Sequence, residues 1–119
     1  MPEPEPSPAA AFAEHCRRHE LAYQLDAEDR PVFRPRVGHA DWRVSAGRGA
    51  VYATTVVRDR GRPPRSVVLV DLDEGFRMMS TVVGLAPEAV QIGMRVRLAW
   101  RDPVGEDDEP PVPVFETDD

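Results

Sequence analysis

The sequence contains one cysteine, Cys16, and no lysine. A single thiol excludes an internal disulfide and a zinc site built from cysteines. The absence of lysine removes one of the usual nucleophiles of covalent catalysis. No apolar run reaches the roughly 18–20 residues that a membrane-spanning helix needs. These absences favour a binding function over covalent chemistry and predict no contact with a membrane.

Other groups for catalysis are also scarce. All three histidines precede the β-rich part of the chain, and no Gly-x-Ser-x-Gly motif occurs. Asp71 and Asp73 share one strand face, which suits acid–base work, but residues 73–75 are better explained as a hairpin turn. Ser80 lies within a strand pattern, and residues 47–49 lack the further glycine and the helix of a phosphate-binding loop. We therefore expect this chain not to be an enzyme by itself.

Charge is distributed unevenly along the chain, whose net charge is -6. Residues 1–9 and the segment from Asp102 onward hold ten of the 21 acidic residues and no base. Residues 10–101 carry the other 11 acids and all 15 bases, every one an arginine, for a net charge of +4. Arginine binds phosphate and carboxylate through a planar fork, so this body suits an anionic ligand or an acidic partner. A genomic preference for arginine explains the bias equally well.

The first half of the chain predicts little regular structure. Residues 1–9 are acidic and rich in proline, which predicts disorder. They lack the basic start and apolar core of a secretory signal, so we expect a cytoplasmic protein.

Residues 10–23 are expected to form a helix. Its one-sided stripe recurs at intervals of three and four residues, at Phe12, Cys16, His19 and Tyr23. Residues 25–42 indicate a loop-rich connection with a short strand near Val32 and another beginning at Trp42.

The second half predicts a barrel of antiparallel strands. The expected strands cover residues 50–57, 66–72, 76–83 and 94–100, and the proline-flanked residues 112–115 return as an edge strand. A short helical turn with Pro87 at its start separates the third strand from the fourth. The fold class is therefore mainly β: a five-stranded OB-fold, a Greek-key barrel in which this short helix plugs the open end. A small open sheet with a flanking helix would use the same elements.

Several segments between Phe12 and Phe115 occur in an order that resembles a known family. They are an aromatic-x-Pro-Arg segment at residues 33–36, the strand at 47–57, the hairpin at 70–77, the strand start at 92–96 and the closing strand at 112–115. In this order they resemble the acyl-CoA-associated OB-fold proteins, the family called domain of unknown function 35. Members of that family have an N-terminal helix, a zinc ribbon with two cysteine pairs and a C-terminal OB-fold.

The zinc ligands of that family are absent here. Leu25 and Glu28 stand where the first cysteine pair would fall, and residues 37–40 replace the second, so we expect no zinc and no other metal. His15 and His19 share a helical face, but Cys16 would point about 100° away from His15. We therefore expect these histidines to be solvated or to pack against other side chains, and not to bind a metal. The remnant is a degenerate, metal-free ribbon-like linker, which either keeps the path of the ribbon or forms a simple loop.

The resemblance divides the chain into four parts and implies a role. The parts are a disordered tail at 1–9, the helix and linker at 10–46, the OB-fold at 47–115 and an acidic tail at 116–119. The family associates with thiolase-like or ketosynthase-like enzymes, so the resemblance implies a non-catalytic subunit of a hetero-oligomer in lipid or aromatic acid metabolism. It would help to bind the CoA thioester, shared with the partner, or stabilise the catalytic subunit, and it would hold no cofactor of its own.

The residues proposed to contact the CoA phosphates or the partner are Arg34, Arg36 and Arg48. The alternative function is a single-stranded nucleic-acid-binding OB-fold module. It would use stacking aromatics and a basic groove, drawn from Tyr52, Phe76, Trp100, Arg48, Arg77, Arg95 and Arg97. The eight aromatic residues, the acidic tails and the absence of lysine argue against that alternative.

Overall fold

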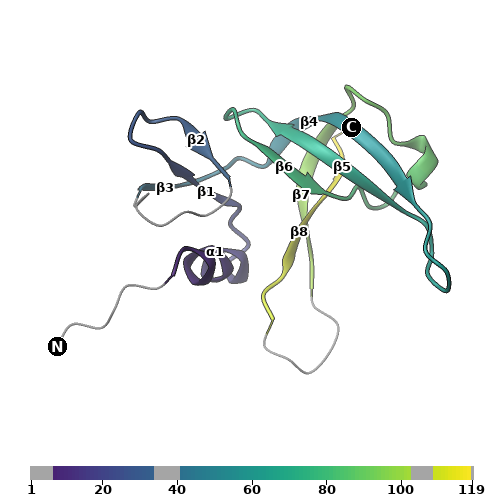
Figure 1. Ribbon diagram of the computed structural model, residues 1–119, viewed down its shortest axis with the longest axis horizontal. Helices are drawn as coiled ribbons and strands as arrows, with labels where there is room; N and C mark the ends of the chain where they lie inside the picture. Colours follow the sequence, from purple (N-terminus) through teal and green to yellow (C-terminus); the bar gives the residue numbers. More distant parts are fainter. Residues whose placement is uncertain (1–6, 34–40, 103–108, 119) are drawn as a thin grey trace.

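The computed structural model describes residues 7–33, 41–102 and 109–118 of the 119-residue chain. A short helix, a three-stranded sheet and a curled five-stranded sheet follow one another along the sequence. Figure 1 shows the helix and the small sheet on one side of the larger sheet. None of the helices in the described part is long and apolar enough to cross a membrane.

Helix α1 (Pro8–Arg17) begins earlier and ends earlier than the sequence predicts. The Ser7 hydroxyl accepts a hydrogen bond from the Ala10 N–H at 3.1 Å, and Pro8 occupies the first turn, so the start is capped. The helix ends because His19 adopts a φ of 58°, in the left-handed region. The predicted helix over residues 10–23 was therefore wrong at both ends.

The segment after α1 forms a small antiparallel sheet in the order β2-β1-β3. Its strands are β1 (Ala22–Leu25), β2 (Pro31–Val32) and β3 (Asp41–Val44). The short strands expected near Val32 and Trp42 are confirmed, whereas β1 was missed. The linker is thus a sheet and not a simple loop. Leu25 ends β1 and Glu28 lies in the turn that follows, while residues 37–40 lie outside the described residues.

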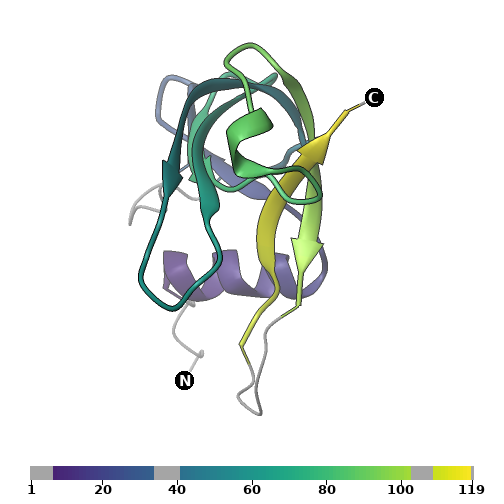
Figure 2. The same ribbon diagram turned by 90° about the vertical axis from the view of Figure 1, so that its right-hand side faces the viewer.

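The larger sheet has the strand order β6-β5-β4-β7-β8, with antiparallel neighbours throughout. The strands are β4 (Arg48–Val57), β5 (Arg65–Leu72), β6 (Arg77–Ser80), β7 (Arg95–Arg101) and β8 (Val112–Thr117). The 3-10 helix η1 (Pro87–Ala89) lies between β6 and β7 in the chain, and Figure 2 shows it in front of the ring of strands. The predicted mainly β fold with an OB-fold barrel is confirmed.

The sheet curls until β6 and β8 meet, at a line that we call the seam. Past the end of β6, Val82 forms a parallel bridge with Phe115. The Phe115 N–H donates to the Thr81 carbonyl at 3.0 Å, and the Val83 N–H donates to the Phe115 carbonyl at 2.8 Å. The Phe115 side chain is fully buried in the core. The backbone hydrogen bonds of Phe115 therefore close the barrel, and its ring is part of the core inside.

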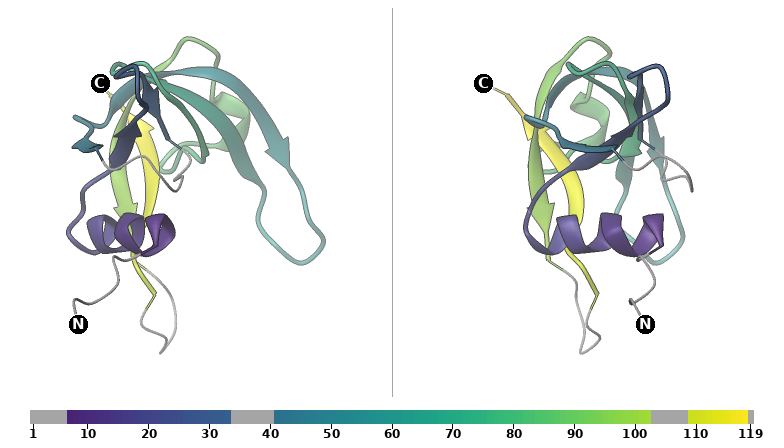
Figure 3. Two further views of the ribbon diagram at one scale, coloured as in Figure 1. Left: turned by 60° about the vertical axis from the view of Figure 1, so that its left-hand side comes forward. Right: turned by 90° about the vertical axis from the view of Figure 1, so that its left-hand side faces the viewer.

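Aromatic rings join the small sheet and α1 to the barrel. The Tyr23 ring stacks on Phe76 at 4.7 Å between centroids, and the Phe33 ring stacks on the same residue at 5.5 Å. Phe12 on α1 then meets Phe33 edge to face at 5.5 Å. Figure 3 shows the resulting arrangement, with α1 and the small sheet together against the barrel. Such pairs contribute beyond their area burial and hold the two parts as one packed body.

Glu74, in the turn between β5 and β6, holds residues 45 and 46, which lead into the barrel, by hydrogen bonds. Its carboxylate accepts hydrogen bonds from the Ser45 hydroxyl at 2.7 Å and from the Ala46 N–H at 2.8 Å. We expect Glu74→Ala to lower the free energy of unfolding by about 1–2 kcal/mol, measured by urea denaturation, because both donors lose a charged acceptor. Glu28→Ala, in an exposed turn, is the control. Equal effects of the two variants would contradict the role of Glu74.

Candidate functional site

The outer face of the barrel carries a row of ion pairs. Arg77 Nε lies 2.6 Å from Asp71 Oδ1, and Arg95 Nη2 lies 2.8 Å from Asp73 Oδ2. The hydrogen bonds from Arg95 hold the pKa of Asp73 below its ordinary value, and the nearby Arg48 charge adds to this effect. The two carboxylates that the sequence placed on one strand face are therefore each engaged by an arginine.

The Asp73–Arg95 pair makes stability depend on pH. Because the folded pKa of Asp73 is lowered, the pair stabilises the fold above the unfolded-state pKa of about 4 and loses this effect as the pH falls further. We expect the stability difference between the wild type and Arg95→Gln to be larger at pH 6 than at pH 3, measured by urea denaturation. Arg62→Gln, in an exposed loop, should show no such dependence. A pH-independent difference for Arg95→Gln would count against the pair.

The aromatic residues of the nucleic-acid alternative are engaged in contacts within the protein. The Arg77 guanidinium lies 3.5 Å from the centroid of the Tyr52 ring. Phe76 is buried, and Trp100 stacks on His19 at 5.2 Å. The accompanying Arg77 and Arg95 are ion-paired. This arrangement disfavours a stacking platform for bases on the barrel.

The three arginines that the sequence singled out are only partly placed by the structure. Arg34 and Arg36 lie outside the described residues. Arg48 is exposed at the start of β4, and its carbonyl accepts a hydrogen bond from the Asp73 N–H at 2.9 Å. A contact of these three residues with CoA stays a prediction.

The glycines on either side of Arg48 are explained by packing inside the barrel. A Cβ atom on Gly49 would lie 2.2 Å from the Asp71 carbonyl oxygen, and one on Gly47 would lie 2.6 Å from the Leu98 Cβ. The structure shows that the neighbouring strands occupy that space.

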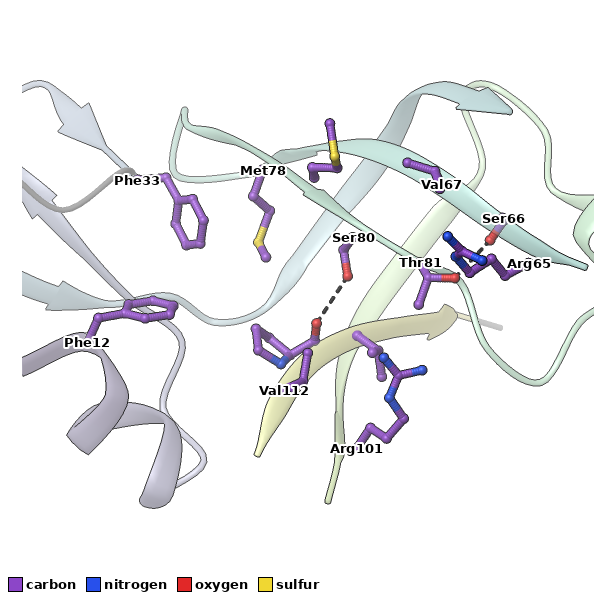
Figure 4. A pocket seen from close by; sticks show the side chains of 13 residues that line it. Phe12, Phe33, Arg65, Ser66, Val67, Met78, Ser80, Thr81, Arg101 and Val112 are labelled. Atoms are coloured by element: carbon purple, nitrogen blue, oxygen red, sulfur yellow. Dashed lines mark hydrogen bonds between the residues drawn. The ribbon is translucent and has the colours of Figure 1, made fainter. Parts of the chain in front are cut away.

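A groove of about 360 Å³ runs along the seam, on the part of it that Phe115 does not close. We call it the seam groove, and Figure 4 shows it from close by. Side chains from α1, from the residue that follows β2, and from the strands on both sides of the seam line it. These residues are Phe12, Phe33, Arg65, Ser66, Val67, Met78, Met79, Ser80, Thr81, Arg101, Val112, Pro113 and Val114. Its volume lies in the range of ligand pockets in proteins.

The two ends of the seam groove differ in chemistry. Figure 4 shows Phe12, Phe33 and Met78 gathered at one end, and the guanidinium groups of Arg65 and Arg101 at the other. Arg65 is paired with an aspartate of the preceding loop at 3.0 Å, whereas Arg101 forms no ion pair with any residue that the structure describes. The groove therefore suits an elongated molecule or segment with an apolar part and an anionic part.

Sequence reasoning missed this groove. Its residues come from segments as far apart in the sequence as Phe12 and Val114, so no local motif contains them. One signal was present: proline at positions 111 and 113 marks a strand that cannot pair fully along one edge.

The histidines and the cysteine of α1 take part in packing. His15 Nδ1 lies 2.9 Å from Glu20 Oε1, and the His15 ring contacts Trp42 at 5.5 Å. Cys16 is 2% exposed, and burial raises the pKa of its thiol, an effect that the charge of Arg17 partly opposes. Among the residues described, no three His, Cys, Asp or Glu side chains are grouped so that they could hold a metal.

With this geometry in view, comparisons with known proteins assign the family. Residues 42–101 match the model of the ChsH2 C-terminal OB-fold domain. The chain belongs to this family. Its resemblance to the domain of unknown function 35 is confirmed by a solved structure described as the Ltp2-ChsH2(DUF35) aldolase. That structure aligns over 98% of both chains, with 30% sequence identity and a TM-score of 0.75.

Two curated relatives of the ChsH2-type domain carry acyl-CoA names. A probable enoyl-CoA hydratase alpha subunit of Thermomonospora curvata is 39% identical over 87 residues, which is 68% of this chain and 26% of the relative. The 3-oxo-4,17-pregnadiene-20-carboxyl-CoA hydratase alpha subunit of Mycobacterium tuberculosis is 33% identical over 104 residues, which is 78% of this chain and 33% of the relative. The chain thus spans about a quarter to a third of the length of these relatives.

Proposed function

We propose that this chain is the OB-fold accessory subunit of an acyl-CoA-processing enzyme whose catalytic subunit is thiolase-like. The observation that carries the proposal is the likeness, over 98% of both chains, to a structure described as an aldolase with a DUF35 part. The two relatives named as acyl-CoA hydratase alpha subunits support the same class of substrate.

The described residues support a non-catalytic role. The carboxylates of Asp71 and Asp73 are held by arginines, and His15 and His19 pack against tryptophan rings. Cys16 is buried with a raised thiol pKa, which opposes formation of the reactive thiolate. A reactive thiol and a general base would then come from the partner, while this subunit covers the acyl-CoA site and stabilises the catalytic subunit.

The proposed function includes contacts between arginines of this subunit and CoA. Arg48 is exposed on the outer face of the barrel, where its guanidinium is accessible to a phosphate. Together with Arg34 and Arg36 it would bind the anionic end of a CoA thioester that the partner also holds. No cofactor belonging to this subunit alone is needed for that role.

Co-expression tests the accessory role. The chain should co-purify in a defined ratio with a co-expressed thiolase-like protein, and acyl-CoA turnover should require both proteins. Failure to form a complex, combined with salt-sensitive binding of single-stranded DNA, would favour the nucleic-acid alternative. Turnover of acyl-CoA by the isolated chain would overturn the non-catalytic role.

Arg48→Ala tests the CoA contact in that complex. We expect the KM for the acyl-CoA substrate to rise about tenfold, corresponding to about 1.4 kcal/mol, with kcat little changed, because a phosphate contact contributes to binding and not to the chemical step. Arg62→Ala, in an exposed loop, is the matched control and should leave KM unchanged. An unaltered KM in Arg48→Ala would remove Arg48 from the CoA site and leave the accessory role standing.

A further inference from the structure

Strand β6 has one edge paired with β5 and one open edge, with which no described strand pairs. The Phe76 carbonyl accepts a hydrogen bond from the Leu72 N–H at 2.8 Å, so the backbone of Phe76 faces β5. Because backbone groups alternate between the two sides of an antiparallel strand, the N–H and C=O groups of Arg77 and Met79 face the other way. That direction is the seam groove, which Met79 helps to line.

Proline prevents β8 from covering this open edge. The backbone of Phe115 points toward β6, since its N–H donates to the Thr81 carbonyl. Two residues earlier, on the same side of β8, stands Pro113, which has no N–H to donate. Its carbonyl instead accepts a hydrogen bond from the Ser80 hydroxyl at 3.1 Å. The barrel therefore closes at Phe115 and stays open beside Pro113.

The rims of the opening are apolar and exposed. The Met79 side chain is 67% exposed on β6, and Val112 is 44% exposed on β8. Phe12 and Phe33 supply an apolar wall at one end of the same groove. An open strand edge bordered by apolar side chains is a ready template for pairing with another chain, and natural proteins usually cover or blunt such an edge.

The polar end of the groove indicates the charge of the occupant. Arg65 and Arg101 both line it, and Arg101 has no ion-pair partner among the described residues. An acidic side chain would complement this end. A hydrocarbon chain could fill the apolar end, but it offers no amide to pair with the N–H and C=O groups of Met79, whereas a polypeptide does.

We propose that the seam groove is a docking slot for an extended segment of a partner protein, which adds as a strand to the open edge of β6. The segment carries apolar side chains toward Phe12 and Phe33 and an acidic side chain toward Arg101. This inference goes beyond the accessory role, because it assigns the surface and the mode of contact and holds whatever reaction the partner performs.

The probe is a synthetic peptide of sequence TVTLTVDE, acetylated and amidated at its ends, added at millimolar concentration to the ¹⁵N-labelled protein. Amide hydrogen exchange of Met79 and Arg77 is measured by NMR. We expect exchange at Met79 to slow by at least about tenfold, because its N–H becomes hydrogen-bonded. The same peptide with alternate amides N-methylated keeps its side chains, loses its strand hydrogen bonds and should give no protection.

Two variants separate backbone pairing from side-chain contact. Met79→Pro removes the N–H that faces the groove and spares the β5–β6 hydrogen bonds, so peptide binding should be lost; Met79→Ala keeps the N–H and should bind with reduced affinity. Arg101→Glu should weaken binding of the acidic peptide, while Arg62→Glu, in an exposed loop, should not. Amide spectra and thermal unfolding of each variant establish that it is folded.

Each outcome decides the proposal. Unchanged exchange at Met79 with the peptide overturns it, and perturbation of groove residues by decanoyl-CoA alone would assign the groove to the acyl ligand instead. Concentration-dependent dimers that protect Met79 without peptide would assign it to a second copy of this chain. In the co-purified complex the Met79 amide should be protected from hydrogen exchange. A complex in which this amide is unprotected would contradict docking in the seam groove and would leave the accessory role intact. If no complex forms, the accessory role fails while the peptide experiment still decides the slot.

Discussion

Phe115→Ala is expected to lower the free energy of unfolding by about 3–5 kcal/mol, the range for removing a large ring from a packed core. The Phe115 side chain is fully buried, and it lies on β8 at the point where the barrel closes. Alanine keeps the backbone hydrogen bonds to Thr81 and Val83, so the loss reports the cavity left inside the barrel. Urea denaturation monitored by far-UV circular dichroism measures it.

Val112→Ala, three positions earlier on the same strand, is the matched control. Its side chain is 44% exposed, so truncation should change stability by no more than about 0.5 kcal/mol. A cost below about 1 kcal/mol for Phe115→Ala would show that the core collapses around the gap or that this ring is not a part of it. In an accessory subunit such a loss of stability would also reduce the yield of the complex, because less of the subunit would be folded.

Gly49→Ala is expected to destabilise the protein by about 2–3 kcal/mol, although it adds a single methyl group. The new Cβ would lie 2.2 Å from the Asp71 carbonyl oxygen and 3.1 Å from the Leu72 Cα, on the paired strand β5. Both are backbone atoms within a sheet, so neither can move aside without distorting the strand pairing. The melting temperature should fall by roughly 8–15 °C, by the usual scaling for a domain of this size.

Gly61→Ala separates this steric effect from the general cost of replacing glycine. Gly61 has a φ of 80°, and a Cβ atom added to it would meet no described atom within 4 Å. Its alanine variant therefore suffers backbone strain alone, about 1–2 kcal/mol. Gly49 has no such φ, and its cost comes from contact. Equal destabilisation by the two variants would contradict the close approach of β4 and β5 at Gly49.

Prediction from the sequence succeeded where the determining interactions are local. Along β5 the side chains of Ser66, Val68, Val70 and Leu72 are buried and alternate with more exposed positions, which is the period-two pattern that identified the strand. The turn before β6 was predictable because a glycine stands there. In the structure Gly75 adopts a φ of 105°, a region that glycine occupies at no steric cost. Pro87 likewise marked the start of η1.

Prediction failed for β1. Residues Leu21 to Gln24 are all buried, so the strand shows no alternation between apolar and polar positions. A helical stripe from Phe12 could be extended through Tyr23 because spacing alone cannot show that the chain reverses at His19. Contact of the Tyr23 ring with Phe76, more than fifty residues away, is a tertiary constraint that local patterning does not contain.

The candidate site shows the same division. The sequence established an arginine-only basic body between acidic tails, and the order of its motifs was sufficient to identify the family. It did not reveal that Asp71 holds Arg77 across the β5–β6 pair, or that Asp73, in the turn after β5, holds Arg95 of β7, because these contacts form only when the sheet folds. The availability of an arginine for a ligand depends on such cross-strand pairs.

The sequence by itself determined the approximate strands of the barrel, the turn before β6 and the family, because alternation, glycine and proline act through neighbouring residues. Only the tertiary structure decided that the barrel closes at Phe115 and remains open beside Pro113. It also decided that Phe12, Phe33, Arg65 and Arg101 meet around that opening. The physical reason is that a groove is formed by surfaces that come together when the sheet curls, and the curl depends on pairing and packing over the whole chain.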